Sequence, residues 1–336
     1  MKRLTLLAAL VLLSTFAFAQ SETHVDAIWI DTRASFHQDW TGEGYNSHFQ
    51  GDYLNLHIKG QLTDQLSFRI RQRLNKRIDD QNPFNATDFL WLRWQATRRW
   101  SFTVGKQPIY IGGYEIDSAP IDVYYYGAFS NHLMQYYAFG ATVTYSPAEG
   151  QDISLQFCPS PVSPAKQNAY TYNLYWNGHI WPWWKTTWSY NFVEDERKWK
   201  MNWIVLGNKF LMGPLAVDVD LINRAAFDQP RFFFTDWTVI GKAILSLGKW
   251  NLCTKVGYEK NDAANVNAAG DTYDLVLPAG NDYFYYGAGV EFFPLGGDHL
   301  RLHAVWFRDN HDNIHNVDVG ITWRFNVYTR RSGSAD

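Results

Sequence analysis

The sequence lacks any long apolar run beyond its first twenty residues. In the rest of the 336-residue chain, no stretch approaches the roughly 20 consecutive apolar residues that a membrane-spanning helix needs. The mean hydropathy of the chain is −0.33, which is polar on average. These two observations exclude helical membrane spans beyond the first twenty residues.

Cysteine is also scarce, since the chain holds only Cys158 and Cys253. Two cysteines do not form the disulfide framework of a small secreted domain. The strands expected to carry them are placed far apart in the predicted sheet, so we expect both thiols to be unpaired. The formal net charge of −3 gives no basic excess, and we expect no nucleic-acid partner.

Sequence motifs of catalysis are absent, including Gly-x-Ser-x-Gly and His-Glu-x-x-His. Two histidines four residues apart, His311 and His315, lie in the stretch "RDNHDNIH". A metal site there is one interpretation, but the surrounding Asp and Asn favour a solvated loop. We therefore predict no catalytic residue, no metal and no cofactor.

The amino terminus does carry a targeting signal. "MKR" precedes the apolar stretch "LTLLAALVLLSTFAF", and the small-x-small pattern of Ala17 to Ala19 follows. This order is typical of a secretory signal peptide over residues 1–19, with a membrane anchor as the alternative. The cut leaves no cysteine at the new terminus, so lipid attachment is not expected.

Aromatic residues are abundant, at 17% of the chain, with 16 Trp, 20 Tyr and 22 Phe. A chain that is rich in aromatics yet polar on average is expected when each apolar residue alternates with a polar one. A barrel with lipid outside and water inside has this pattern. A soluble β-protein also alternates, and it remains the alternative.

About sixteen alternating segments can be counted, each near the ~10 residues of a tilted membrane strand. Long connections near 79–87, 111–134, 159–168, 226–231 and 261–280 alternate with short turns. We predict an all-β, transmembrane antiparallel β-barrel over residues 20–328, with the third extracellular loop folded toward the lumen. Residues 329–336 are predicted to form a disordered tail.

One strand is unusually basic. "SFRIRQRLNKRI", residues 67–78, alternates arginines with apolar residues. The short turn "LTDQ" pairs it with the preceding strand and predicts that Lys59 faces Arg69, that His57 faces Arg71, and that Asn55 faces Arg73. On the other flank, Arg93 is predicted near Arg73. The predicted pore-lining basic patch is Lys59, Arg69, Arg71, Arg73 and Arg93, with His57.

The longest outer segment, residues 111–134, contains Glu115, Asp117 and Asp122 but neither Lys nor Arg. If it folds into the lumen, these acids are expected to face the arginines and partly cancel their charge. The alternative interpretation is a porin in which arginines on one wall face acids on another without selectivity.

Residues 104–129, "VGKQPIYIGGYEIDSAPIDVYYYGAF", resemble the third-loop region of the phosphate-selective porin O and P family, as found in Bacteroidetes-like sequences. A strand ending in Gly-Lys/Arg-Gln leads there into Gly-Gly-x-Glu and a Pro-x-Asp-x-Tyr segment. The matching positions are Gly105, Lys106, Gln107, Gly112, Gly113, Glu115, Pro120, Asp122 and Tyr124.

The resemblance implies a sixteen-stranded trimeric barrel with a constriction loop and an arginine ladder, matched in type by Arg69, Arg71 and Arg73. The implied constriction residues are Gly112, Gly113, Glu115, Asp117 and Asp122. Strong phosphate binders of the family place lysines near the constriction. Here residues 111–134 contain none, and Lys106 is the nearest, so at most a modest anion preference is expected.

We therefore expect a porin of the Gram-negative outer membrane for passive diffusion of small hydrophilic solutes and anions such as phosphate. Its expected partners are outer-membrane lipid, the barrel assembly machinery and two further copies in a homotrimer. A sugar porin is the main alternative, in which Trp91 and tyrosines 124–126 guide the solute. A barrel enzyme is less favoured.

Overall fold

The computed structural model describes residues 23–42, 44–79, 82–163, 168–310 and 313–330. These residues form sixteen β-strands and three short helices. The strands are β1 (His24–Thr41), β2 (Gly44–Thr63), β3 (Leu66–Arg73), β4 (Thr87–Gln95), β5 (Trp100–Pro108), β6 (Tyr137–Ala148), β7 (Gln151–Pro159), β8 (Tyr170–Trp181), β9 (Trp184–Glu194), β10 (Lys200–Met212), β11 (Leu215–Ala226), β12 (Asp236–Leu247), β13 (Trp250–Asn261), β14 (Asp282–Phe292), β15 (Leu300–Asp309) and β16 (His315–Thr329).

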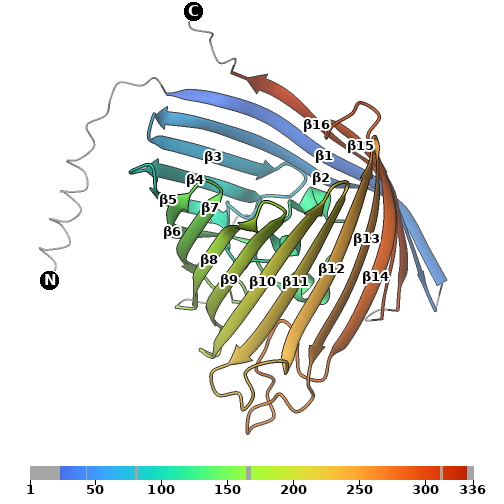
Figure 1. Cartoon of the computed structure of the whole chain (residues 1–336). Coiled ribbons are helices and arrows are strands. Elements are labelled where there is room, and N and C mark those ends of the chain that lie inside the picture. Colours follow the sequence, from blue (N-terminus) through green and yellow to red (C-terminus); the bar gives the residue numbers. More distant parts are fainter. Residues whose placement is uncertain (1–22, 43, 80–81, 164–167, 311–312, 331–336) are drawn as a thin grey trace, which may run out of the picture.

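Each strand pairs with its sequence neighbours, and β1 pairs with β16 to close the ring (Figure 1). This seam between β1 and β16 is antiparallel and runs from Ala27 opposite Thr329 to Trp40 opposite His315. The predicted fold class, an all-β antiparallel barrel of about sixteen strands, is confirmed. Closure leaves neither β1 nor β16 with an unpaired edge.

Alternation along the strands sets which face is apolar. On β16, Val319 and Phe325 are exposed on the outer face, whereas Asp318 and Thr322 are buried inside. The same parity holds on β4, where Leu90 and Leu92 point outward. An apolar outer face with a polar inner face is the arrangement of a barrel in lipid.

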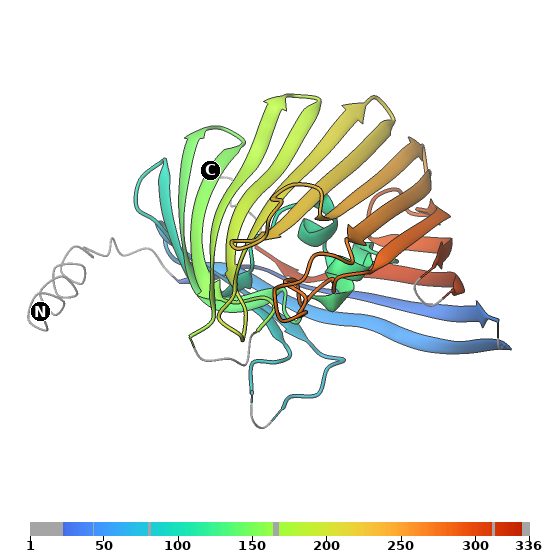
Figure 2. The ribbon, with the colours of Figure 1, turned by 90° about the horizontal axis from the view of Figure 1, so that it is seen from below.

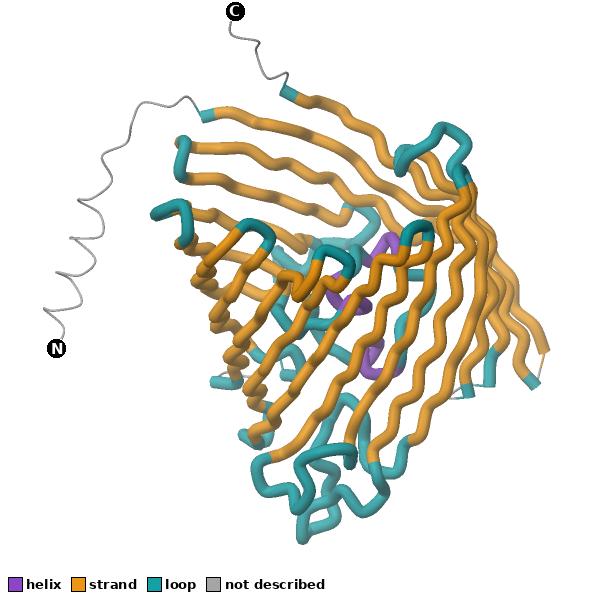
Figure 3. Tube along the Cα trace, in the orientation of Figure 1, coloured by secondary structure: helices purple, strands orange, loops and turns teal. Residues whose placement is uncertain are grey.

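The connections alternate between tight turns at one end and longer loops at the other (Figure 3). The connection between β1 and β2 departs from this pattern. Here β1 and β2 continue as a long hairpin that extends beyond the other strands (Figure 2). Phe36 and Phe49 pack together across it, with ring centroids 5.0 Å apart, which supports the extended pairing.

Residues 109–136 connect β5 to β6 and are called the crossing segment below. They contain the three short helices of the described residues, α2 (Tyr114–Asp117), η1 (Pro120–Asp122) and α3 (Ala128–His132). Figure 2 shows these helices within the ring of strands. Phe129 of α3 packs edge-on against Trp203 of β10, with ring centroids 5.3 Å apart, in a buried apolar cluster.

The predicted signal peptide, residues 1–19, lies outside the described residues. The predicted tail lies mostly outside them, at 331–336, while Thr329 still belongs to β16. No helix within the described ranges is both long and apolar enough to cross a membrane.

Candidate functional site

The basic patch, defined as Lys59, Arg69, Arg71, Arg73, Arg93 and His57, begins on the hairpin of β2 and β3. Lys59 pairs with Arg69, His57 with Arg71, and Asn55 with Arg73. This register is the predicted one and is confirmed. The prediction that the strand continues to residue 78 is wrong, because β3 ends at Arg73, and Arg77 lies in the following loop.

The predicted place of Arg93 is also wrong. Arg93 pairs with Ser67, near the turn end of β3, and not with Arg73. The long loop between β3 and β4 leaves the register free, whereas a tight turn fixes it. Arg93 donates from Nε to Thr103 Oγ1 at 3.1 Å, and its guanidinium lies 5.4 Å from the Trp91 ring centroid.

Two carboxylates that the sequence analysis did not identify lie within the basic patch. Asp88 is buried and accepts from Arg71 Nε at 3.0 Å and from Arg73 Nε at 2.9 Å. Asp31 lies 3.1 Å from His57 Nε2. Asp88 has the parity of lipid-facing Leu90, but the β-bulge between Arg71 and Gln72 shifts the register there and lets Asp88 face inward.

Three cations of the basic patch have no carboxylate partner in the described part of the chain. They are Lys59, which is exposed, together with Arg69 and Arg93. The Arg69 guanidinium instead lies 4.7 Å from the Phe89 ring centroid and 5.7 Å from that of Trp29. The patch therefore has five Lys and Arg residues for two carboxylates and keeps an excess of positive charge.

The crossing segment leaves the wall through Gly112 and Gly113, whose φ angles are 86° and 84°. Only glycine adopts this conformation without strain. The Gly113 N–H donates to Thr187 O, and the next two N–H groups, of Tyr114 and Glu115, donate to Asp220 at 2.8 Å each. Asp220 therefore holds α2 against β11.

The acids of the crossing segment do not face the arginines of β3, which corrects the expectation that they cancel one another. Glu115 pairs with Lys255 of β13 and also accepts from Ser130 Oγ. Asp117 accepts from the Tyr175 hydroxyl at 2.6 Å. Because the acids bind other partners, the positive charge of the basic patch is left in place.

Asp122, the third acid, binds two arginines of the opposite wall. It lies 2.9 Å from Arg301 Nη2 and 2.6 Å from Arg324 Nη2. Arg33 of β1 donates to the carbonyls of Ile121 and Val123 at 3.2 and 3.0 Å. Arg33 and Arg324 were not among the predicted site residues, although both occupy inward positions of their strands.

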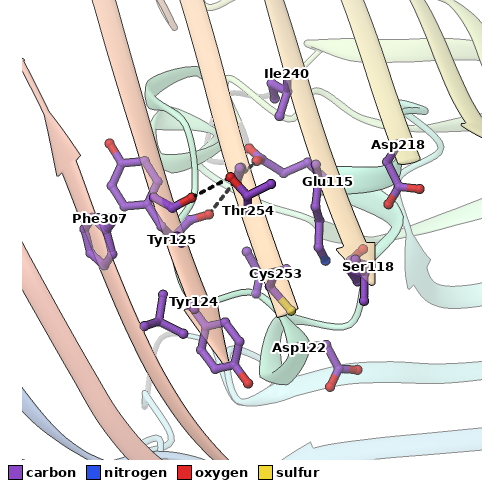
Figure 4. A pocket seen from close by; sticks show the side chains of 18 of the residues that line it. Glu115, Ser118, Asp122, Tyr124, Tyr125, Asp218, Ile240, Cys253, Thr254 and Phe307 are labelled. Carbon is purple, nitrogen blue, oxygen red and sulfur yellow. Dashed lines mark hydrogen bonds and ion pairs between the residues drawn. The ribbon is translucent and has the colours of Figure 1, made fainter. Parts of the chain in front are cut away.

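The phenols of Tyr124 and Tyr125, two of the side chains labelled in Figure 4, complete the attachment of the crossing segment. Tyr124 donates to Glu291 at 2.8 Å and Tyr125 to Asp309 at 3.1 Å. Burial, with the neighbouring carboxylates adding to it, raises the pKa of each phenol well above its ordinary value. Both side chains are therefore neutral donors at physiological pH.

Other residues discussed from the sequence have these positions. Lys106 shares the outer face with Leu90 and Phe139 and donates to Phe84 O at 2.6 Å, away from the lumen. Cys158 and Cys253 are unpaired, as predicted. His311 lies outside the described residues.

A buried Ser, His and Asp lie together on β1, β15 and β16 but do not form a catalytic triad. Ser35 Oγ lies 3.4 Å from His303 Nε2, and Asp318 lies 3.0 Å from the same nitrogen. A triad needs the serine and the carboxylate on different ring nitrogens. Ser35 moreover donates to Asp52 at 2.6 Å.

The family model "Phosphate-selective porin O and P" matches residues 26–177, from β1 into β8. No curated protein sequence matches the chain. Similar solved structures include OmpF of Salmonella typhi in complex with daunomycin, at 13% identity and a TM-score of 0.65, covering 90% of this chain and 98% of that one. An anion-selective porin from Comamonas acidovorans has 9% identity and a TM-score of 0.61, covering 90% of this chain and all of that one. OmpT of Vibrio cholerae has 12% identity and a TM-score of 0.60, covering 92% and 99%.

Proposed function

We propose that the chain is a member of the phosphate-selective porin O and P family, whose model matches residues 26–177, and that it is an outer-membrane porin with a modest preference for anions. Small hydrophilic solutes diffuse passively through its lumen. The observation that carries the anion preference is the excess charge of the basic patch. Five Lys and Arg side chains there have only Asp31 and Asp88 beside them.

The accessible cations are the ones that act on a passing ion. Lys59 and Arg69 face each other across β2 and β3 without a carboxylate partner in the described residues. Charged side chains that line a pore set its ion preference, and their field reaches about 8 Å at physiological ionic strength. Arg71 and Arg73, which share Asp88, contribute less to this field.

We propose that the crossing segment narrows the pore, with Gly112 and Gly113 at its entry and Glu115, Asp117 and Asp122 as its fixed acids. Its attachment to the walls on several sides supports a rigid constriction. It contains neither lysine nor arginine. A strong phosphate site at this level is therefore not part of the proposal.

The reversal potential of planar bilayers in a KCl gradient tests the anion preference. The double variant Lys59→Gln with Arg69→Gln is expected to move the reversal potential toward cation preference. Arg98→Gln with Arg99→Gln removes the same charge from a turn outside the lumen and serves as the control. An equal response of the two double variants, or none, contradicts the role of the basic patch.

The chain is proposed to reach the Gram-negative outer membrane by its signal peptide, with the help of the barrel assembly machinery, and to form a homotrimer among outer-membrane lipids. The family resemblance supports the trimer. Membrane fractionation, and gel mobility before and after heating, test both statements. A folded monomer in the soluble fraction would contradict them.

We further propose that the chain is not an enzyme, which the shared nitrogen in the Ser35, His303 and Asp318 cluster supports. A sugar porin remains testable by liposome swelling with neutral sugars and with charged solutes of similar size. The phenols of Tyr124 and Tyr125 already donate to carboxylates. This leaves them less suited to binding sugar hydroxyls, so we expect no preference for sugars.

A further inference from the structure

The inner face of β12 to β15 carries an apolar area, separate from the buried cluster around Phe129 and Trp203. Two neighbouring rows of cross-strand partners form it. One row is Ile244, Cys253, Gly289 and Val305, and the next is Lys242, Lys255, Gly287 and Phe307. Inward positions on β16 hold Asp, Thr and Arg instead. Tyr125 of the crossing segment covers part of the area, with its ring centroid 4.4 Å from that of Phe307, and the remaining apolar side chains can contact an apolar group of a solute.

The two glycines leave room for the side chains of Phe307 and Val305 to lie close against this wall. A Cβ on Gly287 would lie 2.8 Å from Cβ of Phe307, and one on Gly289 would lie 2.7 Å from Cγ2 of Val305. A cavity of about 90 Å³ lies between these strands and the crossing segment. Tyr124 and Tyr125 border it on the side of the segment (Figure 4). By volume it would hold on the order of six water molecules or a compact organic group.

Most of the charged side chains around the cavity already have partners. Each carboxylate that lines it has a partner: Glu115 has Lys255, Asp122 has Arg301 and Arg324, Glu291 has Arg301, Asp218 has Lys209, and Asp220 has the N–H groups of α2. Lys242 also lines the cavity, half-buried beside the apolar row. It forms no ion pair of its own within the described residues. Its cross-strand neighbour Asp218 is already paired with Lys209, so Lys242 is the cation of the lining that remains open to a further anion.

We propose that this cavity binds compact amphipathic anions, namely monocarboxylates with an aromatic or short aliphatic body, on their way through the pore. The carboxylate pairs with Lys242, while the apolar body packs against Ile244, Val305 and Phe307. The paired acids nearby keep the binding weak, as transit requires. This inference rests on the proposed porin function and names a solute class for it.

Cys253 offers a direct readout because it lines the cavity and is half-buried, whereas Cys158 is buried elsewhere. Modification of Cys253 by a small methanethiosulfonate, located by mass spectrometry, is measured with increasing benzoate, benzamide or inorganic phosphate. Benzoate is expected to protect Cys253 at lower concentrations than the other two. Lys242→Gln is expected to raise the half-protecting benzoate concentration about tenfold. Lys185→Gln, the same change at the exposed start of β9, is expected to leave it unchanged.

A second pair of variants tests the apolar body of the site. Val305→Phe places a ring in the cavity and is expected to abolish protection by benzoate, whereas Val319→Phe makes the same change on the lipid-facing side and is expected to preserve it. Block of the single-channel current by benzoate is expected to follow the same order. Equal protection by benzoate and benzamide, or an unchanged response in Lys242→Gln, overturns the inference. Protection of Cys253 in a chain that conducts no ions would instead contradict the porin function and support the site.

Discussion

The Asp88 carboxylate lies 3.0 Å from Nε of Arg71, and both side chains are buried in the barrel interior. The same carboxylate also binds Arg73. One acid therefore fixes two neighbouring arginines of the basic patch. A buried carboxylate shared in this way relieves the repulsion between like charges and orients both guanidinium groups.

Asp88→Asn should uncover the charge of these two arginines. We expect a shift of the reversal potential toward anion preference, together with a loss of about 1 to 3 kcal/mol in the free energy of unfolding, because two buried guanidinium groups lose a charged acceptor. Planar-bilayer recordings and thermal unfolding in detergent measure the two effects. Glu149→Gln, in an exposed turn, is the control, and an equal shift there would contradict the shielding role of Asp88.

Asp220→Ala should loosen the crossing segment, because it removes the acceptor for the Tyr114 and Glu115 N–H groups. Each hydrogen bond to a charged group contributes about 1.5 to 3 kcal/mol. We expect larger and noisier single-channel currents with the strands still paired. Unchanged conductance would mean that the segment does not limit the current. Asp220→Asn retains one acceptor oxygen and should give an intermediate result.

Arg224→Met should destabilise the long-loop end of the barrel. Arg224 is fully buried, with Asp236 at 2.6 Å and Asp274 at 3.0 Å. Removing one partner of a buried ionic group typically costs about 3 to 5 kcal/mol, and here two carboxylates lose their cation. The change in gel mobility on heating should occur at a lower temperature in Arg224→Met than in the unmodified chain. Limited proteolysis should cut the loop between β13 and β14, and resistance equal to that of the unmodified chain would contradict this role.

Leu155→Arg tests the lipid-facing surface. Leu155 lies midway along β7 and is 62% exposed, so a charge there meets the membrane interior. An arginine at the midplane of a barrel costs about 2 to 4 kcal/mol, against about 0 to 1 kcal/mol near the interface. Leu247→Arg, at the turn end of β12, is the matched control. The free energy of unfolding in lipid vesicles should fall more for Leu155→Arg than for Leu247→Arg. An equal decrease in the two variants would contradict the assigned outer face.

How far the sequence predicts the pore lining depends on the connections between strands. Lys59 and Arg69 were placed correctly because a two-residue turn fixes the register of β2 and β3. Arg93 was misplaced because a long loop precedes β4. Asp88 was not identified, since a bulge reverses its parity, and a bulge has no clear signal in one sequence.

The crossing segment shows a second limit. Its glycines and acids are visible in the sequence, but their partners come from distant strands. Asp122 binds Arg301 and Arg324, which lie about two hundred residues later in the chain. Alternation predicts which face a strand residue occupies, but it does not predict which parts of the inner wall a loop contacts.

The seam between β1 and β16 joins the first strand of the barrel to the last. The wall therefore stays open until the final strand has been synthesised and delivered, and β1 keeps a free edge for all that time. Pairing β1 with β16 brings together residues from the two ends of the barrel. The entropic cost of closing so long a loop makes folding slow. An incompletely folded chain can therefore aggregate through the free edge of β1. Pairing of β16 with β1 removes that edge and ends this risk.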